Sequence, residues 1–232
     1  IYPPFEPVRT DGSNVSVVLR EMEMNGFGLW NQVKARQHSL LAAPMTLQIR
    51  YADDEEKETN DWQFGKHGFV SKEKHEAVYA ANVRSDGVRI ASRSTVTVDG
   101  CMQVRMTLKP GTEARRIDKL VLRIPLKLEE VPLFHPVTYQ NRKHYAGNLP
   151  EGSGVVWDSA DAWGAKSWLA PFVPYIWLGG VPRGLAWFAE TNDGWIVRHG
   201  DEAAPLQEVV REEGQVVLRV YLVNKPHVLC DE

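Results

Sequence analysis

Residues 77–108 decide the fold, and they read AVYAANVRSDGVRIASRSTVTVDGCMQVRMTL. Apolar and polar residues alternate in four runs, which are Ala77 to Arg84, Val88 to Ser94, Thr95 to Val98 and Cys101 to Leu108. Alternation with a period of two is typical of half-buried β-strands. Asp86-Gly87 and Asp99-Gly100 separate the runs, and Asp-Gly is a strong hairpin signal because glycine accepts the positive φ of such turns. The stretch therefore predicts consecutive antiparallel strands.

The same kind of pattern continues on both sides of this stretch. Met45 to Tyr51 alternates cleanly, so we expect Met45, Leu47, Ile49 and Tyr51 to share one buried face. Further strands are expected at Val15 to Arg20, Gly28 to Val33, Ile117 to Leu128, Phe172 to Leu178, Gly184 to Glu190, Leu206 to Arg211 and Gln215 to Asn224. Pro125 indicates an edge or a bulge in its strand. Val131 to Gly154 has little β pattern, and we expect a long structured loop there.

Together these patterns predict one all-β domain over residues 1–232, because helical periodicity is nearly absent and no Pro/Ser/Gly linker divides the chain. The expected architecture is a two-sheet antiparallel β-sandwich, of the galactose-mutarotase-like or jelly-roll-like supersandwich kind. The chain stops just after a strand, which is consistent with a fragment cut at a domain boundary.

Net charge and composition limit the classes of partner that we expect. The net charge of −3 gives no basic footprint for nucleic acid and no polybasic membrane patch. The longest apolar stretch, Phe172 to Leu178, is too short to cross a bilayer. The first residues, IYPPFEPVRT, lack the features of a signal peptide, although a mature or trimmed chain would look the same. We therefore expect neither a nucleic-acid partner nor a membrane partner.

The cysteines and histidines do not predict a metal or redox site. Cys101 and Cys230 lie far apart and fit no metal-binding or redox spacing, and the seven histidines are scattered. We expect no metal and no cofactor. A disulfide between the two cysteines stays open, because the sequence does not say whether their β-carbons face each other.

Six of the eight tryptophans lie between Trp157 and Trp195. Aromatic side chains at this density serve either as a core or as a platform on which sugar rings stack. Residues in the strand patterns are expected to be core between two sheets; they are Phe172, Tyr175, Trp177, Trp187 and Phe188. Trp163 and Trp168 fall in a loop and are the candidates for an exposed platform, with docking onto a neighbouring domain as the alternative.

Three polar residues are further candidates for ligand contacts. His144 lies in the long loop among Tyr, Asn, Arg and Lys residues, Asp161 lies in the aromatic loop, and Arg183 lies at a hairpin tip where it can pair with a carboxylate. Asp158 and Glu190 are the weak alternative for a catalytic carboxylate pair, since glycoside hydrolysis needs two carboxylates on opposite sides of the scissile bond. We favour the simpler interpretation that such carboxylates order turns.

Several segments together resemble a known family. They are Gly147 to Ser159, Phe172 to Gly180, Arg183 to Glu190 and Asp193 to Trp195, supported by Leu40 to Pro44, Leu122 to Leu126 and Tyr221 to Pro226. In these segments the chain resembles bacterial glycoside-hydrolase-like proteins related to the family 123 β-N-acetylgalactosaminidases. The resemblance covers nearly the whole chain and is most specific between Phe172 and Trp195.

The resemblance implies an N-terminal β-sandwich followed by a (β/α)₈ barrel. In the family 123 enzymes the catalytic Asp–Glu pair lies in the barrel, where the substrate's acetamido group assists. The barrel would begin just after Pro226, so none of those catalytic positions falls in this chain. We expect a secreted or periplasmic location.

Our leading hypothesis is an accessory, non-catalytic domain of a carbohydrate-active protein. It would pack on the protein's own catalytic barrel and lend aromatic loops to glycan binding, so the expected partners are a glycan or that barrel. One alternative is a freestanding polysaccharide-degrading enzyme that uses the loop carboxylates. Another is a structural protein-interaction module, which predicts an exposed apolar patch formed by the aromatic segment.

Overall fold

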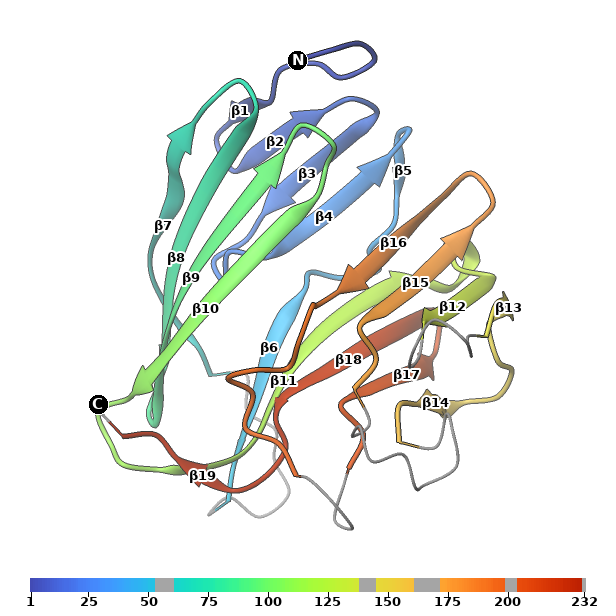
Figure 1. The fold of residues 1–232 in the computed structure, drawn as a ribbon. Coiled ribbons are helices and arrows are strands. Elements are labelled where there is room, and N and C mark those ends of the chain that lie inside the picture. The colour runs from blue at the N-terminus through green and yellow to red at the C-terminus, as the bar shows by residue number, and fades with distance from the viewer. Residues whose placement is uncertain (53–60, 138–144, 161–171, 199–203, 231–232) are drawn as a thin grey trace.

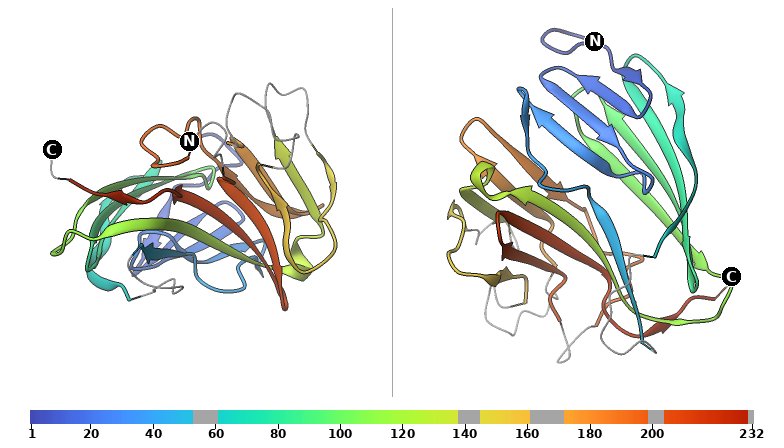
Figure 2. Two further views of the ribbon diagram at one scale, coloured as in Figure 1. Left: turned by 90° about the horizontal axis from the view of Figure 1, so that it is seen from below. Right: turned by 180° about the vertical axis from the view of Figure 1, so that it is seen from behind.

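A computed structural model describes residues 1–52, 61–137, 145–160, 172–198 and 204–230 of the chain. These residues form antiparallel sheets and one short 3₁₀ helix, η1 (Leu128–Glu130). The four small sheets are arranged like a four-bladed propeller (Figures 1 and 2). The predicted all-β antiparallel class is confirmed. The arrangement is not clearly the two-sheet sandwich that was expected.

The first two sheets are each built from strands that follow one another in the chain. The first sheet has the order β1-β2-β3-β4-β5 and the second has the order β10-β9-β8-β7. The first comprises β1 (Arg9–Asp11), β2 (Asn14–Val17), β3 (Arg20–Met24), β4 (Trp30–Ala35) and β5 (His38–Ser39). The second comprises β7 (Gln63–Lys72), β8 (Glu76–Ser85), β9 (Val88–Thr97) and β10 (Met102–Pro110).

The third and fourth sheets draw strands from distant parts of the chain. The third has the order β14-β17-β18-β11-β19, with β6 also paired to β11, and the fourth has the order β13-β12-β15-β16. The third comprises β6 (Thr46–Tyr51), β11 (Arg116–Lys127), β14 (Gly154–Asp158), β17 (Gln207–Glu212), β18 (Gln215–Val223) and β19 (His227–Val228). The fourth comprises β12 (Leu133–Val137), β13 (Gly147–Asn148), β15 (Tyr175–Gly180) and β16 (Arg183–Phe188).

Tight turns keep the second sheet local, as residues 77–108 predict. Both Asp-Gly hairpins are present, and the two runs between them form one continuous strand, β9. Gly100 has a φ of 78°, which is the reason expected for glycine there. Gly87 is required for a different reason, because a Cβ on it would lie 2.5 Å from Cε1 of Tyr51.

Two sequence predictions for strands need correction. The expected strand Val15 to Arg20 is a hairpin, because β2 ends at Val17 and Leu19 turns the chain with a φ of 60°. The expected long loop from Val131 to Gly154 contains two strands in its described part, β12 and β13. β12 escaped notice because Pro136 interrupts its pattern, yet it pairs fully with β15.

The central strand of the third sheet, β11, has β18 on one side and β6 on the other. Pro125 lies beyond the last β6 pair, Arg123 with Thr46, and its carbonyl accepts a hydrogen bond from the backbone N–H of Ala42. On this side Leu41 forms a β-bridge with Leu126, and the register shifts of the strand lie between Ile117 and Val121. The expected edge or bulge at Pro125 is therefore wrong.

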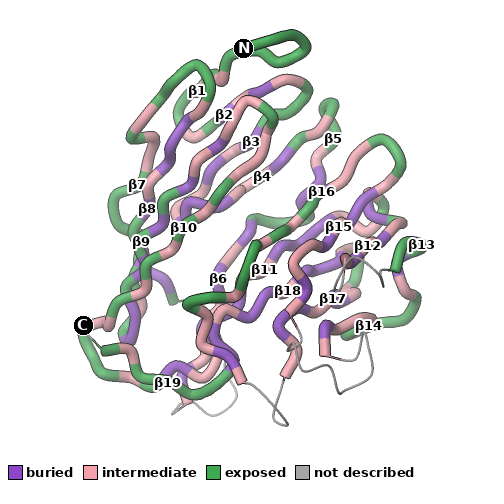
Figure 3. Tube along the Cα trace, in the orientation of Figure 1, coloured by how far each residue is buried: buried purple, intermediate pink, exposed green. Residues whose placement is uncertain are grey.

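One contiguous core joins all four sheets, and Figure 3 shows buried residues along every sheet. Its members include Met22 from the first sheet, Ile90 from the second, Leu120 and Leu218 from the third, and Ile176 from the fourth. Burial of apolar area is the main favourable term in folding, so these inner faces hold the sheets together and leave the outer faces for other roles. None of the described helical residues forms a segment long and apolar enough to span a membrane.

Candidate functional site

The predicted site residues fall in two groups. Asp161, Trp163, Trp168 and His144 lie outside the described residues, so their predicted role stays a prediction. Arg183 is described and begins β16, at the tip of the β15–β16 hairpin.

Arg183 is paired with a carboxylate of its own chain. Its Nε donates to Oε2 of Glu130 at 2.6 Å, and Oε1 of Glu130 lies 3.6 Å from Nδ1 of His38. The hydrogen bond from Arg183 is the main reason that the pKa of Glu130 is lowered, and the charges of Arg183 and His38 add to it. The cluster joins β16, η1 and β5. Arg183 therefore fastens the first and fourth sheets to each other.

The carboxylates weighed for catalysis lie at or just after strand ends, with Asp158 as the last residue of β14. Oδ1 of Asp158 accepts a hydrogen bond from the backbone N–H of Ala160 at 2.8 Å. Glu190 is exposed and follows the end of β16. The Asp193-Gly194 pair forms a turn in which Gly194 has a φ of 80°. Side-chain-to-backbone bonds of this kind order turns, which is the simpler role that we favoured.

The structure adds Glu208, which the sequence did not single out. Glu208 lies opposite Asp158 in the register of β14 and β17, and its Oε2 accepts a 2.7 Å hydrogen bond from the hydroxyl of Tyr221. Burial first, and then the contact with Glu208, raise the pKa of Tyr221. The alternation within β17 and β18 places these residues on one face, so the signal was present, but only the register shows that they meet.

Glu208 belongs to a network of paired charges on the outer face of the third sheet. Arg219 lies 3.7 Å from Glu208 and 3.4 Å from Glu212, and Arg123 lies 3.1 Å from Glu212. Gln215 donates a further hydrogen bond to Glu212 at 2.6 Å. Because each carboxylate already has a cationic partner, this network stabilises the sheet.

The expectation that the strand aromatics form the core is wrong for most of them. The buried residues of the β15–β16 hairpin are aliphatic; they are Ile176, Leu178 and Leu185. Trp187 packs against the core from a half-buried position, whereas Phe188 is 56 % exposed. Trp177 and Tyr175 are half-buried and do not pack against the core cluster. Periodicity predicted the strands, but it could not tell which of two apolar faces is inward.

Trp177 lies flat on the outer face of the fourth sheet because two glycines make room for it. A Cβ on Gly184 would be 2.6 Å from Nε1 and 2.7 Å from Cε2 of the indole, and a Cβ on Gly179 would be 2.7 Å from Cζ2. Gly179 and Gly184 are cross-strand partners on the same face as Trp177. Tyr175 and Phe188 form the neighbouring pair on this face. The result is an aromatic surface of the kind that binds a flat apolar ligand face.

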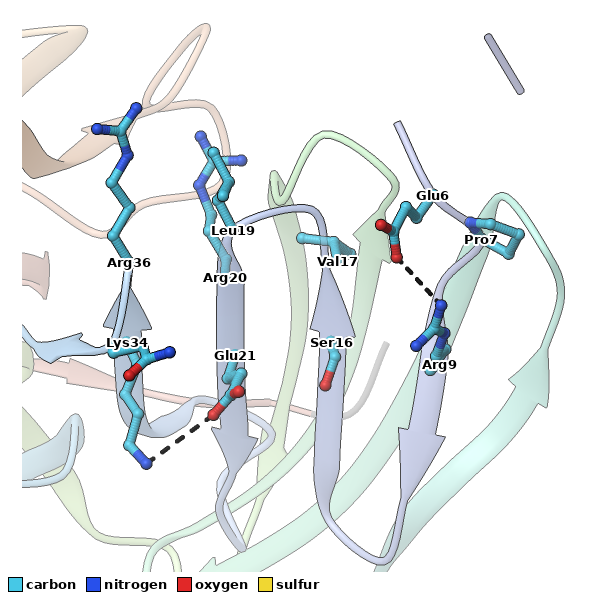
Figure 4. Close-up of a pocket in the computed structure, with 11 residues that line it drawn as sticks. Glu6, Pro7, Arg9, Ser16, Val17, Leu19, Arg20, Glu21, Lys34 and Arg36 are labelled. Atoms are coloured by element: carbon cyan, nitrogen blue, oxygen red, sulfur yellow. Dashed lines mark hydrogen bonds and ion pairs between the residues drawn. The ribbon is translucent and has the colours of Figure 1, made fainter. Parts of the chain in front are cut away.

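A hollow of about 420 Å³ lies over the first sheet (Figure 4). Arg9 pairs there with Glu6 at 3.1 Å, and Lys34 lies 3.9 Å from Glu21. All four side chains are about half exposed or more, and Leu19 is the exposed apolar residue at its rim. Exposed ion pairs contribute little, so this hollow is a solvated polar face and not a formed binding site.

Metal and disulfide chemistry find no support in the part of the chain that the structure describes. There, no group of three His, Cys, Asp or Glu side chains gathers to hold a metal. Cys101 and Cys230 are both free thiols. Burial and the nearby Asp99 carboxylate raise the pKa of the Cys101 thiol, which makes it a poor nucleophile.

Comparison with known families gives one clear match. Residues 8–189, most of the chain, match the family model described as glycoside hydrolase 123, third domain. No curated protein sequence matches the chain. The expected family is therefore supported, but the expected N-terminal position is wrong, since the match is to the third domain.

Proposed function

Because the chain belongs to the glycoside hydrolase 123 family, whose third domain it matches, we propose that it is an accessory, non-catalytic domain of such a hydrolase. In this proposal it packs against a catalytic barrel of the same protein and contributes to glycan binding. The family match is the observation that carries the proposal.

Two features of the described residues agree with a binding role. The indole of Trp177 lies across Gly179 and Gly184, and indole faces stack on the apolar faces of sugar rings through dispersion and their quadrupole. The carboxylates weighed for catalysis, Asp158 and Glu190, lie at turns or strand ends. A domain with this distribution is better suited to holding a glycan than to cleaving it.

The non-catalytic part is tested with the isolated chain and an aryl N-acetyl-β-galactosaminide, together with a polysaccharide panel. We expect no hydrolysis. Hydrolysis that disappears in Asp158→Asn or Glu190→Gln, with the far-UV circular dichroism spectrum unchanged, would overturn the proposal in favour of a freestanding enzyme.

The glycan-binding part is tested in the complete hydrolase with Trp177→Ala. We expect KM for a polymeric substrate to rise while KM and kcat for a small aryl glycoside stay unchanged, because only the polymer reaches a site remote from the scissile bond. Val181→Ala is the matched control, since Val181 is an apolar residue at the tip of the same hairpin and is 94 % exposed. If Trp177→Ala leaves both substrates unchanged, this face binds no glycan.

A further inference from the structure

The outer face of the second sheet is strongly cationic. Along β8, β9 and β10 the burial alternates, and the inward residues, such as Val83, Ile90 and Val96, are almost fully buried. This inner face meets the first sheet, where the hydroxyl of Ser94 donates to the carbonyl of Gly28 at 2.5 Å. The outward positions include five exposed cations: Arg84, Arg89, Arg93, Arg105 and Lys109.

Strand register places these cations directly opposite one another. Arg84 pairs with Arg89, Arg89 pairs with Lys109, and Arg93 pairs with Arg105. Like charges in directly opposite positions destabilise a sheet. The chain as a whole has more acidic than basic residues, 30 against 27, so the cations on this face are not a consequence of a basic composition.

No carboxylate neutralises these rows among the residues that the structure describes. The hydrogen-bond acceptors of these cations are neutral: Arg84 donates to the side-chain oxygen of Gln63, and Arg89 donates to the carbonyl of Pro110. On the first sheet two of the exposed cations, Arg9 and Lys34, each have a glutamate beside them (Figure 4), although Arg20 donates to the backbone carbonyl of Asp99. The second sheet therefore keeps its cationic side chains available to an external anion.

The face also has a shape and hydrogen-bonding groups suited to a ligand. A hollow of about 510 Å³ lies over it, and its lining residues include Phe64, Asn82, Arg84, Arg89, Thr107 and Lys109. Asn82, Ala91 and Thr107 form a neutral row between the two cationic rows. Arg89 and Arg93 are four residues apart on β9, so the cationic rows are separated by about 13 Å at about 3.3 Å per residue.

We propose that the outer face of β7–β10 binds an acidic glycan, one that carries carboxylate or sulfate groups. This inference rests on the proposed role of the domain in glycan binding. Guanidinium groups suit such a ligand because they donate bidentate, charge-assisted hydrogen bonds to planar or tetrahedral oxyanions. The neutral row offers the amide of Asn82 and the hydroxyl of Thr107 to sugar hydroxyls.

Other occupants fit this face less well. The core of a protein–protein interface is depleted of charge, whereas charges dominate here. A nucleic-acid-binding domain is usually basic overall, whereas this chain has a net charge of −3. The acidic glycan is therefore the occupant that the charge distribution and the family together favour.

The experiment measures binding of the chain to chondroitin sulfate, hyaluronan, neutral dextran and a DNA duplex by isothermal calorimetry. Chondroitin sulfate carries both sulfate and carboxylate groups, whereas hyaluronan carries only carboxylates. Comparing the affinities for the two glycans therefore shows which anionic group the face binds. Arg93→Glu and Arg105→Glu are the test variants. Arg9→Glu is the matched control, because it makes the same charge change at an exposed position of the first sheet.

We expect the chain to bind at least one of the two acidic glycans, to lose affinity as salt screens the charges, and to ignore dextran. Arg93→Glu and Arg105→Glu should weaken binding by about tenfold or more, the loss of one or two charge-assisted contacts, while Arg9→Glu should not. Each test variant also creates a Glu–Arg cross-strand pair, so its melting temperature should be unchanged or higher. If Arg93 and Arg105 had a purely structural role, the two variants would instead have a lower melting temperature and unchanged binding.

Three results would overturn the inference. One is an affinity for acidic glycans that Arg93→Glu and Arg9→Glu reduce equally. Another is tighter binding to DNA than to any glycan with the same sensitivity to the variants. The third is the absence of acidic-glycan binding; if a neutral glycan then binds through Trp177 the proposed function survives, and if no glycan binds at all its glycan-binding part fails as well.

Discussion

Replacing Gly184 by alanine tests whether the indole of Trp177 must lie flat on the fourth sheet. A Cβ at this position would lie 2.6 Å from Nε1 of the indole and 2.8 Å from the backbone oxygen of Leu178, closer than real Cβ contacts come. Forced overpacking of this kind costs about 1–3 kcal/mol. Gly180 provides the control in the same hairpin, because its nearest atom would be 3.6 Å away. Gly180→Ala should change stability by less than about 0.5 kcal/mol.

A double-mutant cycle then assigns the cost to the indole. Removing the ring with Trp177→Ala removes the Nε1 and Cε2 contacts, and of the three nearest atoms it leaves the backbone oxygen of Leu178. Gly184→Ala should therefore cost less in the Trp177→Ala background, with a coupling energy of about 0.5–3 kcal/mol. Urea unfolding followed by far-UV circular dichroism measures all four proteins without depending on the deleted fluorophore. Equal costs in both backgrounds would refute the packing argument, and no cost in either would refute the flat placement.

Three further changes test the rest of the fold. Ser159→Ala should destabilise the protein by about 1–3 kcal/mol, since the hydroxyl accepts from two buried backbone N–H groups, one of them that of Gln207; urea unfolding measures it, and Ser159→Thr should restore part of the loss. Arg183→Met should lower the melting temperature at neutral pH, and the difference from wild type should vanish in acid. This sign follows because Arg183 lowers the pKa of Glu130 in the folded state, so its contribution is present above the unfolded carboxyl pKa and is lost as the pH falls through the folded one. A difference that persists in acid would show that packing, not charge, is lost. Leu47→Ala should cost about 2–5 kcal/mol, because Leu47 is 0 % exposed, and a cost below that range would show that the core is loosely packed at β6.

Local alternation predicted individual strands well. Along β6 the four residues expected to face inward, Met45, Leu47, Ile49 and Tyr51, are 3 %, 0 %, 0 % and 1 % exposed. This worked because one face of the strand is apolar and the other polar, so a slip of one residue would expose the whole apolar set.

The same alternation could not predict which strands pair with each other. Alternation says which face of a strand is buried, but β6 pairs with β11, more than 60 residues further along the chain, and nothing in Met45–Tyr51 encodes that choice. The division into four sheets follows from such pairings, which is why the arrangement is not clearly the expected two-sheet sandwich. The candidate site has the same origin, because the indole of Trp177 can lie close to the backbone only where Gly179 and Gly184 meet across a hairpin.

The outer faces of the sheets differ in whether their cationic side chains lie beside carboxylates. On the third sheet Arg219 lies between Glu208 and Glu212, and on the first sheet Lys34 lies beside Glu21. A face that only needs to be stable gains from this arrangement, since opposite charges at cross-strand positions contribute about 0.2–1 kcal/mol each. The third sheet also places Arg123 opposite Arg219, but Glu212 lies beside both of them. The second sheet places Arg93 opposite Arg105 with no carboxylate paired to either among the described residues, and it forgoes that gain. Because the same chain uses the stabilising arrangement elsewhere, the exception is better explained by a ligand that supplies the missing negative charge than by the requirements of folding.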